Sequence, residues 1–294
     1  MPDVPAIKDR LGPVGGIEIV HELTEGIRLT DPLTAWAHTP PTTDPITIRH
    51  GVGGASVDGL RLVMEVGQRV SYFDDRSGRA AVRILNIVPG EPAHVVRTDH
   101  EGRAYSVEYE FRPKQAVYRR DIEITSFVHA IAARGNRLMA HGCGAVLPGG
   151  FGAICLGHSG AGKSTAYRMM DAVSGVRVLN DDRLVLERRP GIFQLWATPW
   201  PGTAGIARAG DAPLGVVALI GRGDQRVTRR LDGAEALTRI LSTLALPIWD
   251  PMLMDAALAA VDDLVARVPV IEMRYPLDST TPGWMIDTLQ EATL

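Results

Sequence analysis

The pattern of apolar and polar positions along the chain changes near residue 126. Before that point, short runs such as residues 104–111 alternate apolar and polar side chains, as strands with one buried face do. Turn-forming segments such as residues 74–78 separate these runs. Residues 1–16 are rich in proline and glycine without any period, and we expect a loose arm there. Residues 1–125 are therefore predicted to form a β-rich N-terminal region with an open or curled antiparallel sheet.

From residue 126 onward, predicted helices and strands alternate. Strands are predicted at residues 144–147, 152–156, 176–180, 184–187, 214–220 and 269–275. Helices are predicted at residues 126–134, with Thr125 or Ser126 as the N-cap, at 164–171, at 252–267 and from Thr281 onward. A further helix start is indicated by the capping-box spacing of Asp232 and Glu235. This order predicts an α/β domain over residues 126–294.

Composition narrows the class of protein. Hydrophobic residues make up 45% of the chain and charged residues 22%, with a formal net charge of -3, which is ordinary for a globular protein. No long basic run is present, so we expect no nucleic-acid partner. Residues 138–157 are uncharged, but their glycines and Pro148 favour two strands and a turn over a membrane helix. Cys143 and Cys155 stand among apolar residues and are interpreted as buried. We therefore expect a soluble, cytoplasmic protein with no membrane partner.

Residues 157–164 read Gly-His-Ser-Gly-Ala-Gly-Lys-Ser and match the phosphate-loop pattern G-x-x-x-x-G-K-[ST] at every fixed position. Glycines let backbone N–H groups turn toward phosphates, the lysine reaches the terminal phosphates, and the hydroxyl binds Mg²⁺. The context also fits, because a predicted strand precedes the loop and a predicted helix follows it. The sequence has lysine only at positions 8, 114 and 163, which makes a chance match less frequent. We predict ATP and Mg²⁺ as ligands, bound by Gly157, His158, Ser159, Gly160, Ala161, Gly162, Lys163, Ser164 and Thr165.

Two adjacent carboxylates, Asp181 and Asp182, follow the predicted strand at residues 176–180. A site for Mg²⁺ and a triphosphate needs one acid to hold the metal and one to accept a proton from the attacking hydroxyl. The alternative is a solvated turn, like the one predicted around Asp74. The helix and return strand that fit after Ser164 favour the functional interpretation. From its spacing alone, His141 is compatible with an ordinary core histidine or with a catalytic group.

The segment at residues 198–203, Thr-Pro-Trp-Pro-Gly-Thr, is stiffened by two prolines. It is compatible with a rigid wall for substrate or nucleotide and equally with a packing corner. Arg183 and Arg208 are candidates to neutralise phosphate charge.

Three of these segments together resemble a known family. Residues 139–142 (Met-Ala-His-Gly), 157–164 and 179–183 (Leu-Asn-Asp-Asp-Arg), in this order and spacing, resemble the C-terminal domain of HPr kinase/phosphorylase, which shares its fold with phosphoenolpyruvate carboxykinase. Residues 198–202 and 249–275 look more like the HPr-kinase-related serine kinases of peptide-modification clusters, including lasso peptide clusters. The resemblance covers the chain from about residue 127 onward.

The resemblance implies a role for each matching residue. Lys163 would contact the transferred phosphoryl group, and Ser164 would bind Mg²⁺ with help from Asp182. Asp181 would be the base toward the acceptor hydroxyl, steered by His141. HPr kinases also carry a glutamate in a glycine-rich segment after the paired aspartates, whereas this chain has no acidic residue at 198–202. HPr as the substrate, the reverse phosphorolysis and a second metal site therefore do not carry over.

The sequence thus predicts a phosphate-loop, phosphoenolpyruvate-carboxykinase-like α/β kinase domain preceded by a β-rich region. We expect it to transfer the γ-phosphoryl group of ATP to a serine hydroxyl of a peptide or small protein, with a precursor peptide as one candidate. A small-metabolite kinase of the same fold and a non-catalytic nucleotide-binding regulatory protein are the alternatives. The complete set of Lys163, Ser164, Asp181 and Asp182 argues against the second of these, because binding alone needs no placed base. An oligomer is compatible with the sequence.

Overall fold

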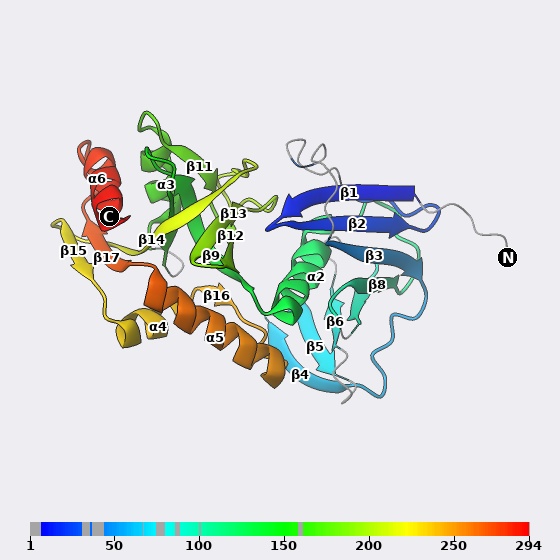
Figure 1. Ribbon diagram of the computed structural model, residues 1–294. Helices are drawn as coiled ribbons and strands as arrows, with labels where there is room; N and C mark the ends of the chain where they lie inside the picture. Colours follow the sequence, from blue (N-terminus) through cyan, green and yellow to red (C-terminus); the bar gives the residue numbers. More distant parts are fainter. Residues whose placement is uncertain are drawn as a thin grey trace. The chain divides into compact units, whose positions relative to one another are not determined.

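The chain forms two compact units, which Figure 1 shows in sequence colours. The computed structural model describes residues 7–30, 36, 44–66, 68–74, 80–85, 89–99, 101–157 and 161–293. The first unit comprises Met1–Arg134 with Pro247–Met254, and the second comprises Gly135–Leu246 with Asp255–Leu294. The division therefore lies at residue 134 and not at 125, and no local sequence pattern indicated that residues 247–254 return to the first unit.

The first unit contains an eight-stranded sheet in the order β1-β2-β3-β8-β7-β6-β5-β4. Its strands are β1 (Ile7–Val14), β2 (Ile17–Leu23), β3 (Pro45–Val52), β4 (Arg61–Val66), β5 (Val70–Asp74), β6 (Ala80–Ile84), β7 (His94–Thr98) and β8 (Ala104–Tyr109). From β4 to β8 neighbouring strands are antiparallel, but β3 runs parallel to both β2 and β8. The expectation of a purely antiparallel sheet is therefore wrong. The long connection from β2 to β3 permits a crossover, which a tight turn does not.

Strand β1 occupies much of the segment that we expected to be a loose arm. It pairs antiparallel with β2, and the side chains of Leu11 and Val14 are buried. The expectation is wrong for residues 7–14, while residues 1–6 lie outside the described part of the chain. The pairing is irregular between Leu11 and Val14, where glycine and proline intervene. Backbone pairing with β2, and not local side-chain alternation, therefore defines this strand.

Helix α2 (Arg119–Arg134) begins well before the predicted start. Ile122, Ser126 and Ala130 are buried at four-residue spacing, so the buried face extends through the first turns. Ser126, which we predicted as a possible N-cap, lies inside the helix and is buried. The prediction was wrong because polar residues occupy part of the buried face, which breaks the apolar period.

Those polar residues belong to a buried hydrogen-bonded chain in the first unit. The Nε of Arg119 donates to Oε1 of Glu123 at 2.5 Å, and the same oxygen lies 3.1 Å from Nε2 of His21. The Nδ1 of His21 is 2.9 Å from Nε2 of His50, whose Nδ1 is 2.9 Å from the hydroxyl of Tyr109. All five side chains are buried. These hydrogen bonds join α2 to strands β2, β3 and β8, and each of them satisfies a buried polar group.

The second unit is built on a nine-stranded sheet, with helices beside it (Figure 1). Its strands are β9 (Arg137–Val146), β10 (Gly152–Leu156), β11 (Arg177–Asn180), β12 (Arg183–Arg189), β13 (Ile192–Ala197), β14 (Asp211–Arg222), β15 (Val227–Arg230), β16 (Leu244–Ala245) and β17 (Val270–Tyr275). The main order is β10-β9-β12-β13-β14-β17-β15, with β11 and β16 paired to β9. Strand β10 also pairs in parallel with β14. The unit is thus a mixed α/β structure with parallel and antiparallel pairs.

Its helices are α3 (Lys163–Asp171), α4 (Gly233–Leu241), α5 (Pro251–Arg267), which starts in the first unit, and α6 (Thr281–Thr293). The two predicted caps are confirmed. The Asp232 side chain accepts the backbone N–H of Glu235 at 2.9 Å, and Asp250 accepts that of Met252 at 2.9 Å. Among the described residues, no helix has both the length and the apolar character needed to cross a membrane.

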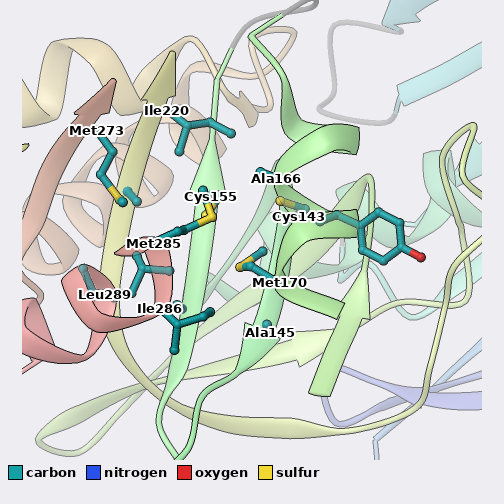
Figure 2. Packing of buried hydrophobic residues seen from close by; sticks show 14 of the residues in the cluster. Cys143, Ala145, Cys155, Ala166, Met170, Ile220, Met273, Met285, Ile286 and Leu289 are labelled. Carbon is teal, nitrogen blue, oxygen red and sulfur yellow. The ribbon is translucent and has the colours of Figure 1, made fainter. Parts of the chain in front are cut away.

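A buried apolar cluster packs β10 and α3 together with their neighbours in the second unit (Figure 2). Cys143 of β9 and Cys155 of β10 are direct partners in the strand register and are fully buried, as the sequence predicted. Hydrogen bonding to Cys155, together with burial, raises the pKa of the Cys143 thiol well above its usual range. Met170 of α3 and Met285 of α6 belong to the same cluster. This packing fixes the strand before the phosphate loop and the helix after it.

Candidate active site

The predicted phosphate loop connects β10 to α3, as its strand–loop–helix context requires. His158, Ser159 and Gly160 lie outside the described residues. Gly162 precedes the helix with a φ of 99°, a left-handed conformation that an L side chain rarely adopts. Its carbonyl oxygen accepts the N–H groups of Thr165 at 3.0 Å and Ala166 at 2.8 Å. Glycine at this position therefore allows the loop to turn directly into the first turn of α3.

Lys163 is the first residue of α3, and its side chain points back to the loop. Its Nζ donates to the carbonyl oxygen of Gly157 at 2.7 Å, and the residue is buried. Burial lowers the pKa of Lys163, and the negative charge of Asp182 acts in the opposite direction. The amine is thus held against the residue that directly follows β10.

Asp182 pairs with His141 across two neighbouring strands. The Nδ1 of His141 is 2.9 Å from Oδ1 of Asp182, and the N–H of Gly142 donates to the backbone oxygen of Asp182 at 2.9 Å. The register places His141 of β9 opposite Arg183, the first residue of β12. The side chain of His141 is 42% exposed and that of Asp182 14%, so the pair is accessible from solvent.

Asp181 has an entirely different environment. It is 4% exposed, and its carboxylate accepts three backbone N–H groups, from Gly202 at 2.8 Å, Ala204 at 2.9 Å and Ile206 at 3.3 Å. The resemblance implied that His141 steers Asp181, but the structure pairs His141 with Asp182. Adjacent residues at a strand end project to opposite sides, so only one of the two aspartates can face His141.

Sequence reasoning missed Asn180, which holds the turn between β11 and β12. Its Oδ1 accepts the N–H groups of Asp182 at 2.7 Å and Arg183 at 2.9 Å, and its Nδ2 donates to the carbonyl oxygen of Thr198 at 2.8 Å. The residue is fully buried. An asparagine immediately before a pair of turn residues is a recognised signal for this type of turn, and it was available in the sequence.

The segment around Trp200 packs against the paired aspartates. Trp200 is 2% exposed, which matches a packing corner and not an exposed wall. A Cβ on Gly202 would lie 2.8 Å from Oδ2 of Asp181 and 2.8 Å from Cβ of Asp182, so this close approach requires glycine. Arg208 bonds to Asp171 of α3, with Nη2 at 3.1 Å from Oδ2, and therefore ties the same loop to the helix.

The residues predicted to hold Mg²⁺ are Ser164, which is partly exposed, and Asp182. Within the described part of the chain, no group of three or more His, Cys, Asp or Glu side chains could hold a metal ion. One hydroxyl and one carboxylate do fit Mg²⁺ bound together with a nucleotide, because that ion keeps waters and substrate phosphates as most of its ligands.

Comparisons with known proteins give little beyond this geometry. No model of a known protein family matches the chain, and no curated protein sequence matches it. A structure of the Hpr(Ser) kinase/phosphatase from Coxiella burnetii is similar over 52% of this chain and 88% of its own, with 11% identity and a TM-score of 0.30.

Proposed function

We propose that this protein is an ATP-dependent kinase that transfers the γ-phosphoryl group to a serine hydroxyl of a peptide or small protein. Bound Mg·ATP would supply the phosphoryl group and neutralise part of its charge. The observation that carries the proposal is the partly exposed His141–Asp182 pair, at 2.9 Å, in which His141 precedes Gly142, the β9 residue that pairs with Leu156 directly before the phosphate loop. A phosphate-loop lysine and an accessible carboxylate–histidine pair are the two groups that such a transfer needs from the protein.

The structure suggests a different division of roles from the one implied by the resemblance. In our proposal the serine oxygen bonds to the γ-phosphorus, ADP leaves, and Asp182 accepts the proton of the serine hydroxyl. His141 orients the Asp182 carboxylate. Lys163 exchanges its contact with the Gly157 carbonyl for the phosphates, a stronger charge-assisted pair. Ser164 holds Mg²⁺. Asp181 is a positioning residue that fixes the loop at residues 202–206.

Three variants and one control test the roles of Asp182, Lys163 and Asp181. Transfer is measured from radiolabelled ATP to a mixed library of serine-containing peptides, and Mg·ATP affinity is measured by calorimetry. Asp182→Asn should lower transfer by roughly 10²–10⁴-fold, the range for loss of a general base, with Mg·ATP affinity nearly intact.

Lys163→Ala should weaken Mg·ATP binding by about 1.5–3 kcal/mol and abolish transfer. Asp181→Asn should lower thermal stability, and Asp224→Asn, an exposed change in the same unit, is the matched control.

Each outcome has a distinct meaning. Loss of Mg·ATP affinity in Asp182→Asn would make this residue a metal ligand and return the base role to Asp181. ATP turnover that rises with small alcohols but not with peptides would replace the peptide acceptor by a metabolite. Nucleotide binding without any transfer by the wild-type protein would leave a regulatory module and contradict the kinase proposal.

A further inference from the structure

A basic concave surface lies at the other end of strand β12 from the paired aspartates. It encloses about 350 Å³, a volume within the range of ligand pockets. It is lined by Asn136, Arg188, Arg189, Pro190, Gly191, Asp263 and Arg267. These residues come from the start of β9, the β12–β13 turn and the last turns of α5, and all belong to the second unit.

Two arginines of this surface are held through their Nε atoms, which leaves their Nη groups available to a ligand. The Nε of Arg189 donates to Glu187 at 2.8 Å, and its guanidinium carbon lies 5.2 Å from the ring centre of Trp196. The Nε of Arg267 donates to Asp263 at 2.5 Å. Among the described residues, the Nη groups of these two arginines have no hydrogen-bond partner. Such an Nη fork is the geometry that pairs with a carboxylate or phosphate.

The charge of the surface is unbalanced. Three arginines line it against a single carboxylate, Asp263, and Arg188 is 3.9 Å from that carboxylate. Glu187 does not remove the excess, because it also accepts from Arg137 at 2.8 Å. The whole chain has a formal net charge of -3, so this is a local basic site on an acidic protein. It therefore attracts an anionic partner against the overall charge.

Strand β12 connects this surface to the candidate active site. The strand runs from Arg183, next to Asp182, to Arg189, and a strand of that length spans about 20 Å at ~3.3 Å per residue. We propose that the basic surface docks an acidic segment of the peptide acceptor, with carboxylates placed about six extended residues from the serine. This inference rests on the proposed function, because it assumes a peptide acceptor.

The test is a binding measurement that needs no transfer. Fluorescence anisotropy is recorded with a labelled peptide that carries three glutamates, a short glycine spacer and a serine, and with the same peptide carrying three glutamines. The wild-type protein should prefer the glutamate peptide at least tenfold, and raising the salt concentration should reduce that preference. The Arg188→Gln/Arg189→Gln variant and the separate Arg267→Gln variant should each lose at least fivefold. Arg230→Gln, which removes one positive charge from exposed strand β15 as Arg267→Gln does from the basic surface, should lose nothing.

Two results would overturn the inference. Equal affinity of the wild-type protein for both peptides would exclude a carboxylate site. Inorganic phosphate that binds this surface as tightly as the peptide, with all three arginines required, would identify a free anion as the occupant instead. Calorimetry of Mg·ATP on every variant separates these results from a failure of the kinase proposal, since docking variants should bind nucleotide normally.

Discussion

At the residue scale, three consecutive side chains have three separate sets of partners. Asn180 bonds to the backbone of its own turn and of Thr198, Asp181 to the backbone of residues 202–206, and Asp182 to His141. The sequence located the carboxylates and predicted that adjacent residues on a strand face opposite ways. It could not predict which one faces His141, because that depends on the register between β9 and β12, which no local pattern specifies.

Replacement of Asn180 tests the importance of this turn. Asn180→Ala removes the acceptor of two partly buried backbone N–H groups, so the free energy of unfolding should fall by about 1–3 kcal/mol. Asp182 should also lose its fixed direction, so kinase activity should fall more than Mg·ATP affinity does. Chemical denaturation and the transfer assay measure the two effects. A variant of unchanged stability would show that water replaces the asparagine.

At the element scale, the sequence predicted those elements whose signals lie within the element itself. Helices α4 and α5 begin where Asp232 and Asp250 supply caps, and strand β10 coincides with its apolar run. Strand β1 and the start of α2 were not predicted, since their determinants are distant in the chain. Strand β1 exists through pairing with β2, and the first turns of α2 bury polar side chains whose partners, such as His21 and Asp9, lie on distant strands. Local propensity cannot encode such partners.

At the scale of the whole molecule, the buried histidines are unevenly distributed. The described residues of the first unit bury His21, His50, His94 and His129, whereas His141 of the second unit is partly exposed. Burial lowers the pKa of His94 and of His129 to about 4, and it lowers that of His50 well below its usual range. Neither ring nitrogen of His94 has a hydrogen-bond partner within the described part of the chain. The folded first unit therefore disfavours protonated histidine.

This distribution predicts that acid weakens the first unit before the second. Because the folded pKa values lie below the unfolded value near 6.5, the unfolded state binds more protons between about pH 6.5 and pH 4. Stability from these groups is complete above that window and falls as the pH drops through it. In the second unit Glu272 has the opposite character: burial raises its pKa, but hydrogen bonds from Arg239, Arg229 and Arg274 outweigh this and lower it to about 2. Its contribution is lost only as the pH falls below about 4.5.

Hydrogen exchange resolved by peptide measures the two units separately. Protection in β2, β3 and β8 should decline between pH 6.5 and 4 after correction for intrinsic exchange, while protection in β14 and β17 should hold. His94→Leu should flatten the decline in the first unit, and His141→Leu should leave it unchanged. A simultaneous loss of protection in both units would contradict the prediction.

The position of Lys163 has a consequence for covalent labelling. The chain contains lysine only at positions 8, 114 and 163, and burial lowers the pKa of Lys163, so more of this amine is unprotonated and nucleophilic at a given pH. Because Lys163 is buried, acylation there should be slow, but Mg·ATP should suppress the adduct that does form and leave the adducts at the other two lysines unaffected. Peptide mass spectrometry measures all three, and labelling of Lys163 that ignores Mg·ATP would place the nucleotide elsewhere. With so few competing amines, one chemical adduct becomes a readout of nucleotide occupancy that needs no knowledge of the acceptor.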